Sequence, residues 1–532
     1  MISIRERVYG SLMPIKITVE NLLYDGHSRS SERYALMSPM LSKSKFVGGW
    51  QCEKQAFLTA RYPKLATPFD SATLARFAGG TRFGELAQSV WPDGVLIDSP
   101  AYRHDASVEW TSELIHGDVV DFIFEAGFTE LGTRVRADVM IRNRESSKWD
   151  LIEVKSSSSA KKVHDVDMAI QRAVIEAAGV EVGTTSVMLV DSSYVRGAGG
   201  VSTDGLFKIV DRTSEVEALL PTMIELNSHL HDVINSETAP NIGIGPHCEE
   251  PYGCQFFEHC TVDRPRDWIK TLPGFGLKKT VEFEAQGVVG ISHVSSDTGL
   301  NSLQSRAVKS TNSGTQWVSE RLSDDLSNVE YPLRFIDFET AAPTVPMYES
   351  TSPREVIAFQ WSCHTLDADG RLDHSDYLAS GEVDPRREFV ESLLRAVGSS
   401  GSVLVYSSYE QTTLRRLAEL FPDLESRIND LISRIVDLLN LVKNNYYHPA
   451  FRGSFSIKRV LPVMVPGNDY SDLVIGEGET ASAAFVDIVE GRVDEDELDD
   501  VLFDLLEYCK RDTEAMVRIW QRLQAISVNG DS

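Results

Sequence analysis

The sequence has no long hydrophobic run and comparatively few positive charges. No stretch of about 18 uncharged apolar residues occurs in the 532 residues, so we expect no membrane-spanning helix and no membrane partner. The N-terminal segment MISIRERVYGSLMPIKI also lacks the apolar core of a secretory signal. These absences predict a cytoplasmic protein.

Lysine and arginine number 52 against 79 aspartates and glutamates, which gives a net charge of −27. Because phosphate binding depends on Lys and Arg, this balance argues against loose, nonspecific coating of DNA. The acidity is uneven, since residues 469–507 hold fourteen acidic residues and a single basic one, Arg492. A local basic groove elsewhere is therefore compatible with the composition.

Six cysteines are too few for a disulfide scaffold in a chain of this length. Two of them lie in apolar or helical segments and are predicted to be buried packing residues, Cys363 and Cys509. The other four are one upstream cysteine and three evenly spaced ones: Cys52, Cys248, Cys254 and Cys260.

The composition is that of a globular protein, with 42% hydrophobic and 25% charged residues, and the length predicts more than one domain. Alternating helical and strand-like patterns occur in two separate parts of the chain. We predict four regions: an N-terminal extension at 1–36, an α/β domain at 37–265, a helical linker rich in Ser and Gly at 266–329, and a second α/β domain at 330–525.

Three charged residues lie on two expected strands of the first α/β domain. VRADVMIRN and WDLIEVKSS place Asp138 inside one strand and put Glu153 and Lys155 on one face of the next. Such carboxylates bind Mg²⁺ or Mn²⁺, which activates water for phosphodiester hydrolysis, and an ammonium group stabilises the developing charge. The following helix directs Gln171 towards the same sheet. A surface ion pair between Glu153 and Lys155 is the alternative.

Asp, then Glu-x-Lys, then a helix with a glutamine resembles the PD-(D/E)XK nuclease superfamily and its RecB-like branch. The resemblance implies that Asp138 and Glu153 bind metal, that Lys155 assists the water and that Gln171 orients the site. The RecB-like branch usually has Gln-x-x-x-Tyr, and Ile175 stands where the tyrosine is expected.

The same superfamily carries an acidic residue on a helix upstream of the strands. The segment GGTRFGELAQSVW resembles that helix, and Glu85 is the candidate. A solvated glutamate at the start of a helix is the alternative.

One cysteine before this motif and three after it resemble the iron–sulfur subset of RecB-like and AddB-like nucleases. The resemblance implies a [4Fe–4S] cluster that joins the end of the domain to its first helix and closes a loop of about two hundred residues. A structural zinc ion and unliganded buried cysteines are the alternatives, although zinc ligands usually come in closer C-x2–4-C pairs. The implied ligands are Cys52, Cys248, Cys254 and Cys260.

The linker contains the glycine-rich segment LPGFG at residues 272–276, followed by Lys278 and Lys279. This segment resembles a helix-hairpin-helix, in which backbone N–H groups of a glycine turn bind a phosphate. An ordinary turn between helices is the alternative.

The second α/β domain has a D-x-E strand and a late amphipathic helix. RFIDFET puts Asp337 and Glu339 on one face, and the helix near the C-terminus stacks Tyr508 and Asp512 at i, i+4. This arrangement resembles the DnaQ-like (DEDD) exonucleases of the RNase H-like fold. The resemblance implies that Asp337, Glu339 and Asp512 bind two divalent metal ions and that Tyr508 positions the attacking water.

The middle acidic residue of that family is less clear in this sequence. Tyr409-Glu410 lies after an apolar strand where Asn-x-x-Phe-Asp is expected, so Glu410 is preferred, and Asp437 is the alternative. A degenerate domain that serves only as a scaffold is a further alternative.

The stretch NYYHPAFRGSFSIKRVLP is dense in aromatic and basic residues. We predict that it binds a nucleic-acid strand, with bases on the aromatic rings and phosphates at the cations. A core segment between helix and loop is the alternative. The residues concerned are Tyr447, Phe455, Arg452, Lys458 and Arg459.

Together the elements resemble an uncharacterised bacterial family in which a RecB-like iron–sulfur nuclease is joined to a DnaQ-like domain. The resemblance implies metal-dependent, exonucleolytic cleavage of single-stranded or end-bearing DNA in repair, recombination or anti-phage defence, with a helicase or another subunit as partner. Two alternatives are a non-catalytic nucleic-acid-binding subunit of a helicase–nuclease complex and an RNA-directed nuclease.

Overall fold

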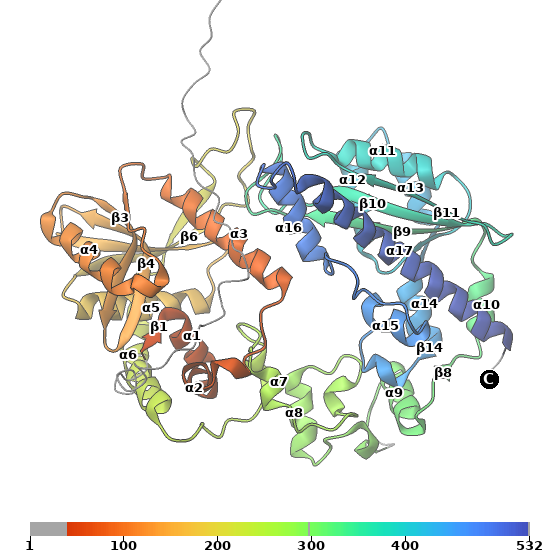
Figure 1. Ribbon diagram of the computed structural model, residues 1–532, viewed down its shortest axis with the longest axis horizontal. Helices are drawn as coiled ribbons and strands as arrows, with labels where there is room; N and C mark the ends of the chain where they lie inside the picture. Colours follow the sequence, from red (N-terminus) through yellow and green to blue (C-terminus); the bar gives the residue numbers. More distant parts are fainter. Residues whose placement is uncertain (1–39, 296–297, 530–532) are drawn as a thin grey trace, which may run out of the picture. The chain divides into compact units, whose positions relative to one another are not determined.

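The computed structural model describes residues 40–295 and 298–529, so the extension expected at residues 1–36 lies outside the described residues. Within that part the chain is a mixed α/β protein, and its strands form two larger sheets that each contain parallel and antiparallel pairs (Figure 1). None of the helices in these ranges combines the length and the apolarity that crossing a membrane requires.

The strands of the first sheet are β1 (Leu41–Ser42), β2 (Val95–Leu96), β3 (Phe122–Glu130), β4 (Thr133–Asn143), β5 (Lys148–Lys155), β6 (Val182–Val190) and β7 (Phe207–Asp211). They follow the order β2-β3-β4-β5-β6-β7, with β1 beside β4. β3, β4 and β5 are antiparallel neighbours, and β6 runs parallel to β5. In β4 buried Val135, Ala137 and Val139 alternate with the less buried Arg136 and Asp138, the period of a strand with one covered face.

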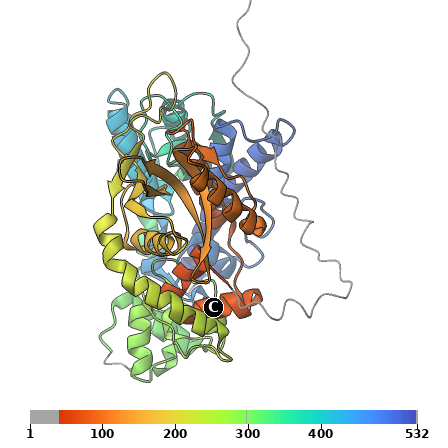
Figure 2. The same cartoon turned by 90° about the vertical axis from the view of Figure 1, so that its left-hand side faces the viewer.

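The helices of this half are α1 (Lys43–Gln51), α2 (Glu53–Arg61), α3 (Ser71–Gln88), α4 (His104–Gly117), α5 (Lys162–Ala177), α6 (Thr213–Asn235) and α7 (Phe257–Cys260). α5 packs against β3, β4 and β6 on one side and against α6, which is yellow-green in Figure 2, on the other. Every residue from Val163 to Ile175 is therefore buried. Polar side chains of α5 in this stretch must find partners inside the protein.

The expected linker contains α8 (Leu277–Ala285), α9 (Ser302–Ser313), β8 (Trp317–Val318) and α10 (Leu322–Ser327). Its apolar residues, among them Trp268 and Phe275, share one core with Tyr447 and Trp520 of the C-terminal region. The hairpin expected at residues 272–276 is preceded only by the three-residue 3₁₀ helix Ile269–Thr271. The prediction of a complete helix-hairpin-helix was therefore wrong at its first helix.

The strands of the second sheet are β9 (Leu333–Ala341), β10 (Ile357–Leu366), β11 (Leu372–Leu378), β12 (Val403–Val405) and β13 (Ile435–Asp437), and β14 (Tyr446–Tyr447) pairs with β8. The order is β11-β10-β9-β12-β13. β9, β10 and β11 are antiparallel neighbours, whereas β12 is parallel to both β9 and β13. The expected D-x-E strand thus lies at the centre of a mixed sheet.

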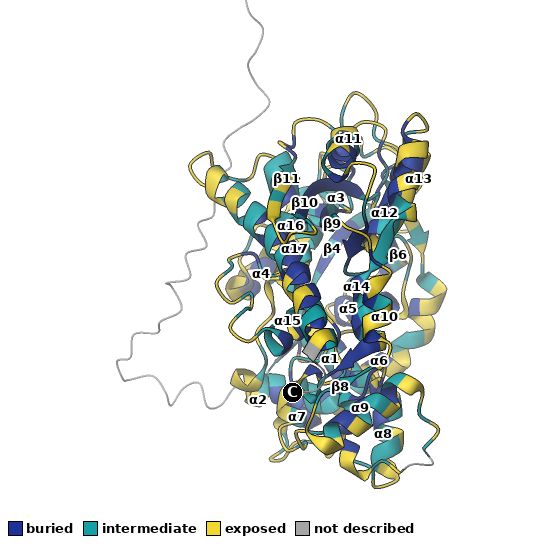
Figure 3. Cartoon of the chain, turned by 90° about the vertical axis from the view of Figure 1, so that its right-hand side faces the viewer, coloured by how far each residue is buried: buried dark blue, intermediate teal, exposed yellow. Residues whose placement is uncertain are grey.

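The helices of this half are α11 (Arg386–Val397), α12 (Tyr409–Leu420), α13 (Glu425–Ser433), α14 (Leu438–Asn445), α15 (Ile457–Met464), α16 (Gly478–Val489) and α17 (Leu498–Asn529). The long α17 packs on β9 and β10, and Figure 3 shows its buried and exposed faces in different colours. Both Cys363 on β10 and Cys509 on α17 are fully buried, which confirms that prediction.

Candidate functional site

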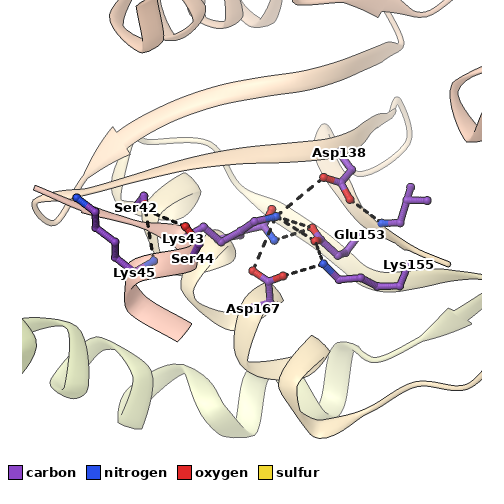
Figure 4. Close-up of polar contacts among 10 residues, drawn as sticks. Ser42, Lys43, Ser44, Lys45, Asp138, Glu153, Lys155 and Asp167 are labelled. Carbon is purple, nitrogen blue, oxygen red and sulfur yellow. Dashed lines mark hydrogen bonds and ion pairs between the residues drawn. The ribbon is translucent and has the colours of Figure 1, made fainter. Parts of the chain in front are cut away.

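Asp138 and Glu153 lie side by side on the antiparallel strands β4 and β5 (Figure 4). Asp138 Oδ2 accepts a hydrogen bond from the Val154 backbone N–H at 2.7 Å, which fixes the carboxylate across the strand pair. Glu153 is only 1% exposed. The structure therefore brings the two predicted acidic residues into one group.

Two lysines and a glutamine surround the Glu153 carboxylate. Lys155 Nζ lies 2.5 Å from Oε1, and Gln171 Nε2 donates to Oε2 at 2.7 Å. The second ammonium group is that of Lys43 at the start of α1, whose Nζ donates to Oε1 at 3.0 Å. Lys43 was not predicted, because it lies 110 residues before Glu153 and no motif of the strands refers to it.

Asp167 on α5 is a third carboxylate of this first centre. Its Oδ2 accepts a hydrogen bond from Lys155 Nζ at 3.0 Å, and its Oδ1 lies 3.8 Å from Lys43 Nζ. The signal was present in the sequence, since Asp167 lies one helical turn before Gln171 and shares its face.

Glu125 on β3 also approaches this group. The pairs on either side, Phe124 with Val139 and Ala126 with Ala137, place Glu125 opposite Asp138, and Glu125 has a φ of +58°, a value uncommon for a residue other than glycine. Burial raises the pKa of Glu125, and the nearby Lys43 opposes that rise. Glu125 was not predicted, because no motif of the sequence refers to this residue.

Glu85, the acidic residue expected from an upstream helix, does not join the group. It is exposed on α3, and it forms no hydrogen bond or ion pair with Asp138, Glu153 or Lys155 in the described residues. The structure instead places Glu125 and Asp167 near the two predicted carboxylates.

Charge and burial give the carboxylates of this centre different protonation. Burial and the neighbouring Glu153 raise the pKa of Asp138 to about 7. Although burial opposes it, the ammonium groups of Lys155 and Lys43 hold the pKa of Glu153 well below its ordinary value. Asp167 Oδ1 and Gln171 Oε1 are buried without a hydrogen-bond partner in the described part of the chain. Unsatisfied hard oxygen atoms beside two carboxylates are the ligands that a divalent cation accepts.

We expect Lys43→Met to destabilise the metal-free protein by about 2 kcal/mol, because it leaves three buried carboxylates with one ammonium group. Mn²⁺ should restore much of the loss, since a cation can then replace the missing charge. Thermal unfolding with and without Mn²⁺ measures both effects.

The matched control is Lys45→Met. Lys45 lies on the same helix, forms no ion pair in the described residues and points away from the carboxylates (Figure 4). An equal loss of stability in both variants, with no response to Mn²⁺, would contradict the role of Lys43 as a charge partner.

The four predicted cysteines converge, although they are far apart in the sequence. They line one cavity and are all free thiols. Cys52 ends α1, and the backbone N–H of Cys254 donates to the carbonyl of Cys248 at 2.9 Å, which folds the C-terminal segment back on itself. Burial raises the pKa of Cys254 to about 11, and the neighbouring thiols add to the rise.

The spacing of these sulfur atoms bears on the ligand. A tetrahedral zinc with Zn–S bonds of about 2.3 Å places its sulfur atoms about 3.8 Å apart. Among the described residues, no three of the four cysteine sulfur atoms all lie within 4.8 Å of one another. Asp337, Glu339 and Cys509 do form such a group of ligand atoms. The wider spacing fits a ligand larger than a single ion.

Asp337 and Glu339 share one face of β9, as predicted, and form the second centre with Asp512 of α17 and Glu410 of α12. Glu339, Glu410 and Asp512 are all less than 10% exposed: 6%, 4% and 8%. Burial, followed by the charge of Asp512, raises the pKa of Asp337 well above its ordinary value. Burial likewise raises the pKa of Glu410 to about 7 and that of Asp512 to about 6.

Positive charge is scarce in this second centre. None of the four carboxylates forms an ion pair in residues 40–295 and 298–529. Lys458 faces the group without pairing with it, since its Nζ donates to Tyr508 Oη at 3.3 Å. The Glu339 carboxylate makes no hydrogen bond in the same part of the chain. Buried carboxylates without counter-charge fit divalent cations, which take oxygen ligands.

No sequence motif placed three further side chains in the second centre. Tyr470 Oη donates to Asp512 Oδ1 at 2.5 Å from a loop that the sequence marked only as acidic. Cys509 Sγ lies 3.8 Å from Asp337 Oδ2, although its burial was predicted. Lys458, for which the sequence predicted phosphate binding, contacts Tyr508.

Glu410 and Asp437, the two candidates for the middle acidic residue, have different partners in the structure. Glu410 adds to the charge that raises the pKa of Asp337. Asp437 caps α14, since its carboxylate accepts hydrogen bonds from Asn440 N at 3.0 Å and Asn440 Nδ2 at 2.7 Å, and its charge adds to the rise in the pKa of Glu410. The structure therefore brings Glu410 to the second centre.

Tyr447 does not form the stacking surface that its neighbourhood suggested. It is 1% exposed and packs in the core against Phe451 and Phe455. Arg452 and Arg459 are exposed and make no ion pair in the described residues. The prediction of a base stacked on Tyr447 was wrong, because an aromatic-rich stretch looks the same whether it faces solvent or core.

Comparisons with known proteins give distant relatives. A family model described as "Domain of unknown function (DUF2779)" matches residues 334–456, which include Asp337, Glu339 and Glu410. Uncharacterized protein UU173 of Ureaplasma parvum serovar 3 (strain ATCC 700970) is 20% identical over 275 residues, and the match covers 47% of this chain and 38% of that relative. The crystal structure of SSO0001 is 14% identical, over 40% of this chain and 84% of that one, with a TM-score of 0.18.

Proposed function

We propose that this protein is a metal-dependent nuclease that hydrolyses phosphodiester bonds of DNA. The observation that carries the proposal is the second centre, where four carboxylates from β9, α12 and α17 meet in a buried group without an ion pair among the described residues. Such a group is unfavourable unless it is protonated or binds cations. The arrangement is also the one that the resemblance to DnaQ-like exonucleases implies.

In the second centre, Asp337, Glu339 and Asp512 would hold Mg²⁺ or Mn²⁺, with Glu410 beside Asp337. When bound, these ions lower the pKa of a water molecule and stabilise the charge that develops on the phosphate. Tyr508 would orient the attacking water, because its hydroxyl is fixed by the hydrogen bond from Lys458. Tyr470 would orient Asp512 through its hydrogen bond to Oδ1.

In the first centre, Asp138 and Glu153 would hold the cation, with Asp167 as a third carboxylate. Gln171 keeps the Glu153 carboxylate oriented, since it donates to Oε2. Lys155 would stabilise charge on the phosphate or orient the water, as in the PD-(D/E)XK resemblance. Lys43 lies between the same carboxylates and neutralises them when no cation is present.

The test of the proposal is cleavage of a 5′-labelled single-stranded DNA by the full-length protein with Mn²⁺ or Mg²⁺ and with EDTA. We expect cutting that requires the metal ion and that proceeds from an end of the strand. A labelled RNA of the same sequence separates an RNA-directed enzyme from a DNA nuclease. Absence of cleavage with both ions and both polymers would overturn the proposal in favour of a non-catalytic binding subunit.

We further propose that Cys52, Cys248, Cys254 and Cys260 bind a [4Fe–4S] cluster, supported by their shared cavity and by sulfur atoms spaced more widely than around one zinc. The cluster would join the end of α1 to the segment after residue 245. Its role would be structural, because the cross-link closes a loop of about two hundred residues.

We expect the purified protein to be brown and Cys254→Ser to lose the colour. Loss of the cross-link should also cost on the order of 4 kcal/mol of stability, by the entropy of the closed loop. Visible absorption, iron and zinc content and thermal unfolding measure the effect. Cys363→Ser is the control, since this buried cysteine lies on β10 and should leave the colour unchanged. A colourless wild-type protein that contains zinc would show that the four thiolates bind a single ion.

A further inference from the structure

A cavity of about 560 Å³ lies between the expected linker and the second α/β domain. The glycine turn contributes Gly274, α9 contributes Leu303, and the C-terminal region contributes Tyr406, Lys443 and Phe455 to its wall. Two segments that the sequence marked separately, the LPGFG turn and the aromatic and basic stretch, thus line one cavity.

Close backbone packing fixes this cavity. A Cβ at Gly453, where φ is +79°, would lie 2.4 Å from the Thr271 carbonyl oxygen, so only glycine allows the two loops to meet. Gln304 Nε2, which is buried, donates to the Pro273 carbonyl at 3.0 Å and attaches the turn to α9. The linker and the second domain therefore form a single wall around the cavity.

The charge of the wall is opposite to that of the protein. Lys443 is the one charged residue among those that line the cavity, although the chain carries a net charge of −27. Its Nζ lies 6.0 Å from the centre of the Phe455 ring. The remaining wall is uncharged and includes apolar and aromatic side chains, of which Leu303 and Tyr406 are only partly buried. A ligand with one anionic group and one flat apolar group fits such a wall.

The cavity adjoins the second centre along two segments of the chain. Tyr406 follows β12, and Glu410 of the carboxylate group comes four residues later. Ser456, which also lines the cavity, lies two residues before Lys458, whose Nζ donates to Tyr508 Oη. Two segments of the chain therefore connect the wall of the cavity to residues of the second centre.

We propose that this cavity binds one nucleotide of a single-stranded nucleic acid whose neighbouring phosphodiester lies at the second centre. The phosphate contacts Lys443, and the base packs against Leu303, Tyr406 and the edge of Phe455. This inference rests on the proposed function, because it names where the substrate strand is held. The volume lies in the range of about 300–1,000 Å³ that small-molecule sites occupy, which accommodates a single nucleotide.

The test is the binding of dye-labelled oligothymidylate and oligouridylate to the full-length protein without added divalent cation, followed by fluorescence anisotropy over a range of salt concentrations. We expect Lys443→Gln to weaken binding about fivefold and to reduce the slope of log K against log salt by about 0.7, the value for one phosphate contact of a single strand. Lys309→Gln is the matched control, since Lys309 is an exposed lysine of α9 outside the cavity.

A second variant, Leu303→Trp, fills the cavity without changing charge. It should weaken binding while the salt slope stays that of the wild type. The polymer that binds more tightly identifies DNA or RNA as the source of the nucleotide. If Lys443→Gln and Leu303→Trp both bind like the wild type, the inference is overturned, even if the protein cleaves DNA. If binding depends on Lys443 but no metal ion supports cleavage, the proposed function fails and the inference stands.

Discussion

Replacing Asp337 by asparagine should remove the cleavage that belongs to the second centre, with a fall in rate of about 10³-fold, or about 4 kcal/mol of transition-state stabilisation. Asp337 lies at the middle of the group, with Glu339 on the same strand and Asp512 opposite on α17. An amide binds a divalent cation much more weakly than a carboxylate does. Single-turnover cleavage of labelled DNA at saturating Mn²⁺ measures the loss.

The same variant should be more stable than the wild type in the absence of metal. Burial and the charge of Asp512 raise the pKa of Asp337, so its ionised form is unfavourable in the folded protein. A raised pKa means that the folded protein loses stability as the pH rises, so the gain from Asp337→Asn should be present at neutral pH and absent in acid. We expect a gain of about 1 kcal/mol, or about 2–4 °C in Tm, and the loss of stabilisation by Mn²⁺ at this centre.

The matched control for Asp337→Asn is Asp437→Asn. Asparagine caps a helix about as well as aspartate does, so the cap of α14 should survive. Both cleavage and stability should stay close to the wild type. A large loss of cleavage in Asp437→Asn would show that Asp437 belongs to the second centre.

Most strands and helices that carry the two centres could be predicted from the sequence, because they follow simple periodic patterns. VRADVMIRN alternates and RFIDFET is an apolar strand, so both patterns predicted strands that carry Asp138 and Asp337. The late helix shows the spacing that places Tyr508 and Asp512 on one side. Periodicity identifies the face of an element, and that is sufficient where the centre is built from one face of each element.

Partners that come from outside those elements could not be predicted in this way. Lys43 reaches Glu153 from the first turn of α1, and Tyr470 reaches Asp512 from a loop, so both contacts depend on tertiary packing. Glu125 lies opposite Asp138 with a φ of +58°, and neither this pairing nor this backbone conformation is marked in the sequence. Tyr447 shows the opposite failure, since the pattern identified an aromatic residue but not the core that buries it.

Glu153→Gln should have a large effect on the first centre, and its effect on stability should be opposite in sign to that of Asp337→Asn. Glu153 is the shared acceptor of Lys43, Lys155 and Gln171. Removal of its charge leaves two partly buried ammonium groups without their common partner, a loss on the order of 3 kcal/mol. The cleavage that depends on this centre should fall by about 10²-fold or more, since a metal ligand is lost. Thermal unfolding measures the loss of stability. Cleavage by Glu153→Gln combined with Asp337→Asn, compared with Asp337→Asn alone, measures the loss at the first centre.

The pH dependence of stability distinguishes Glu153, a carboxylate stabilised by ammonium groups, from Asp337, a carboxylate without counter-charge. The pKa of Glu153 is held below its ordinary value, so the stability it supplies is fully present above the unfolded value of about 4.3 and is lost as the pH falls below it. Glu153→Gln should therefore be destabilising at neutral pH and approach the wild type only in strong acid, whereas Asp337→Asn should be stabilising at neutral pH. Equal signs for the two substitutions would show that the lysines do not compensate the first centre. Opposite signs would follow from the difference in counter-charge between the two centres. The first centre has ammonium groups of its own, whereas the second must obtain its positive charge from bound ions.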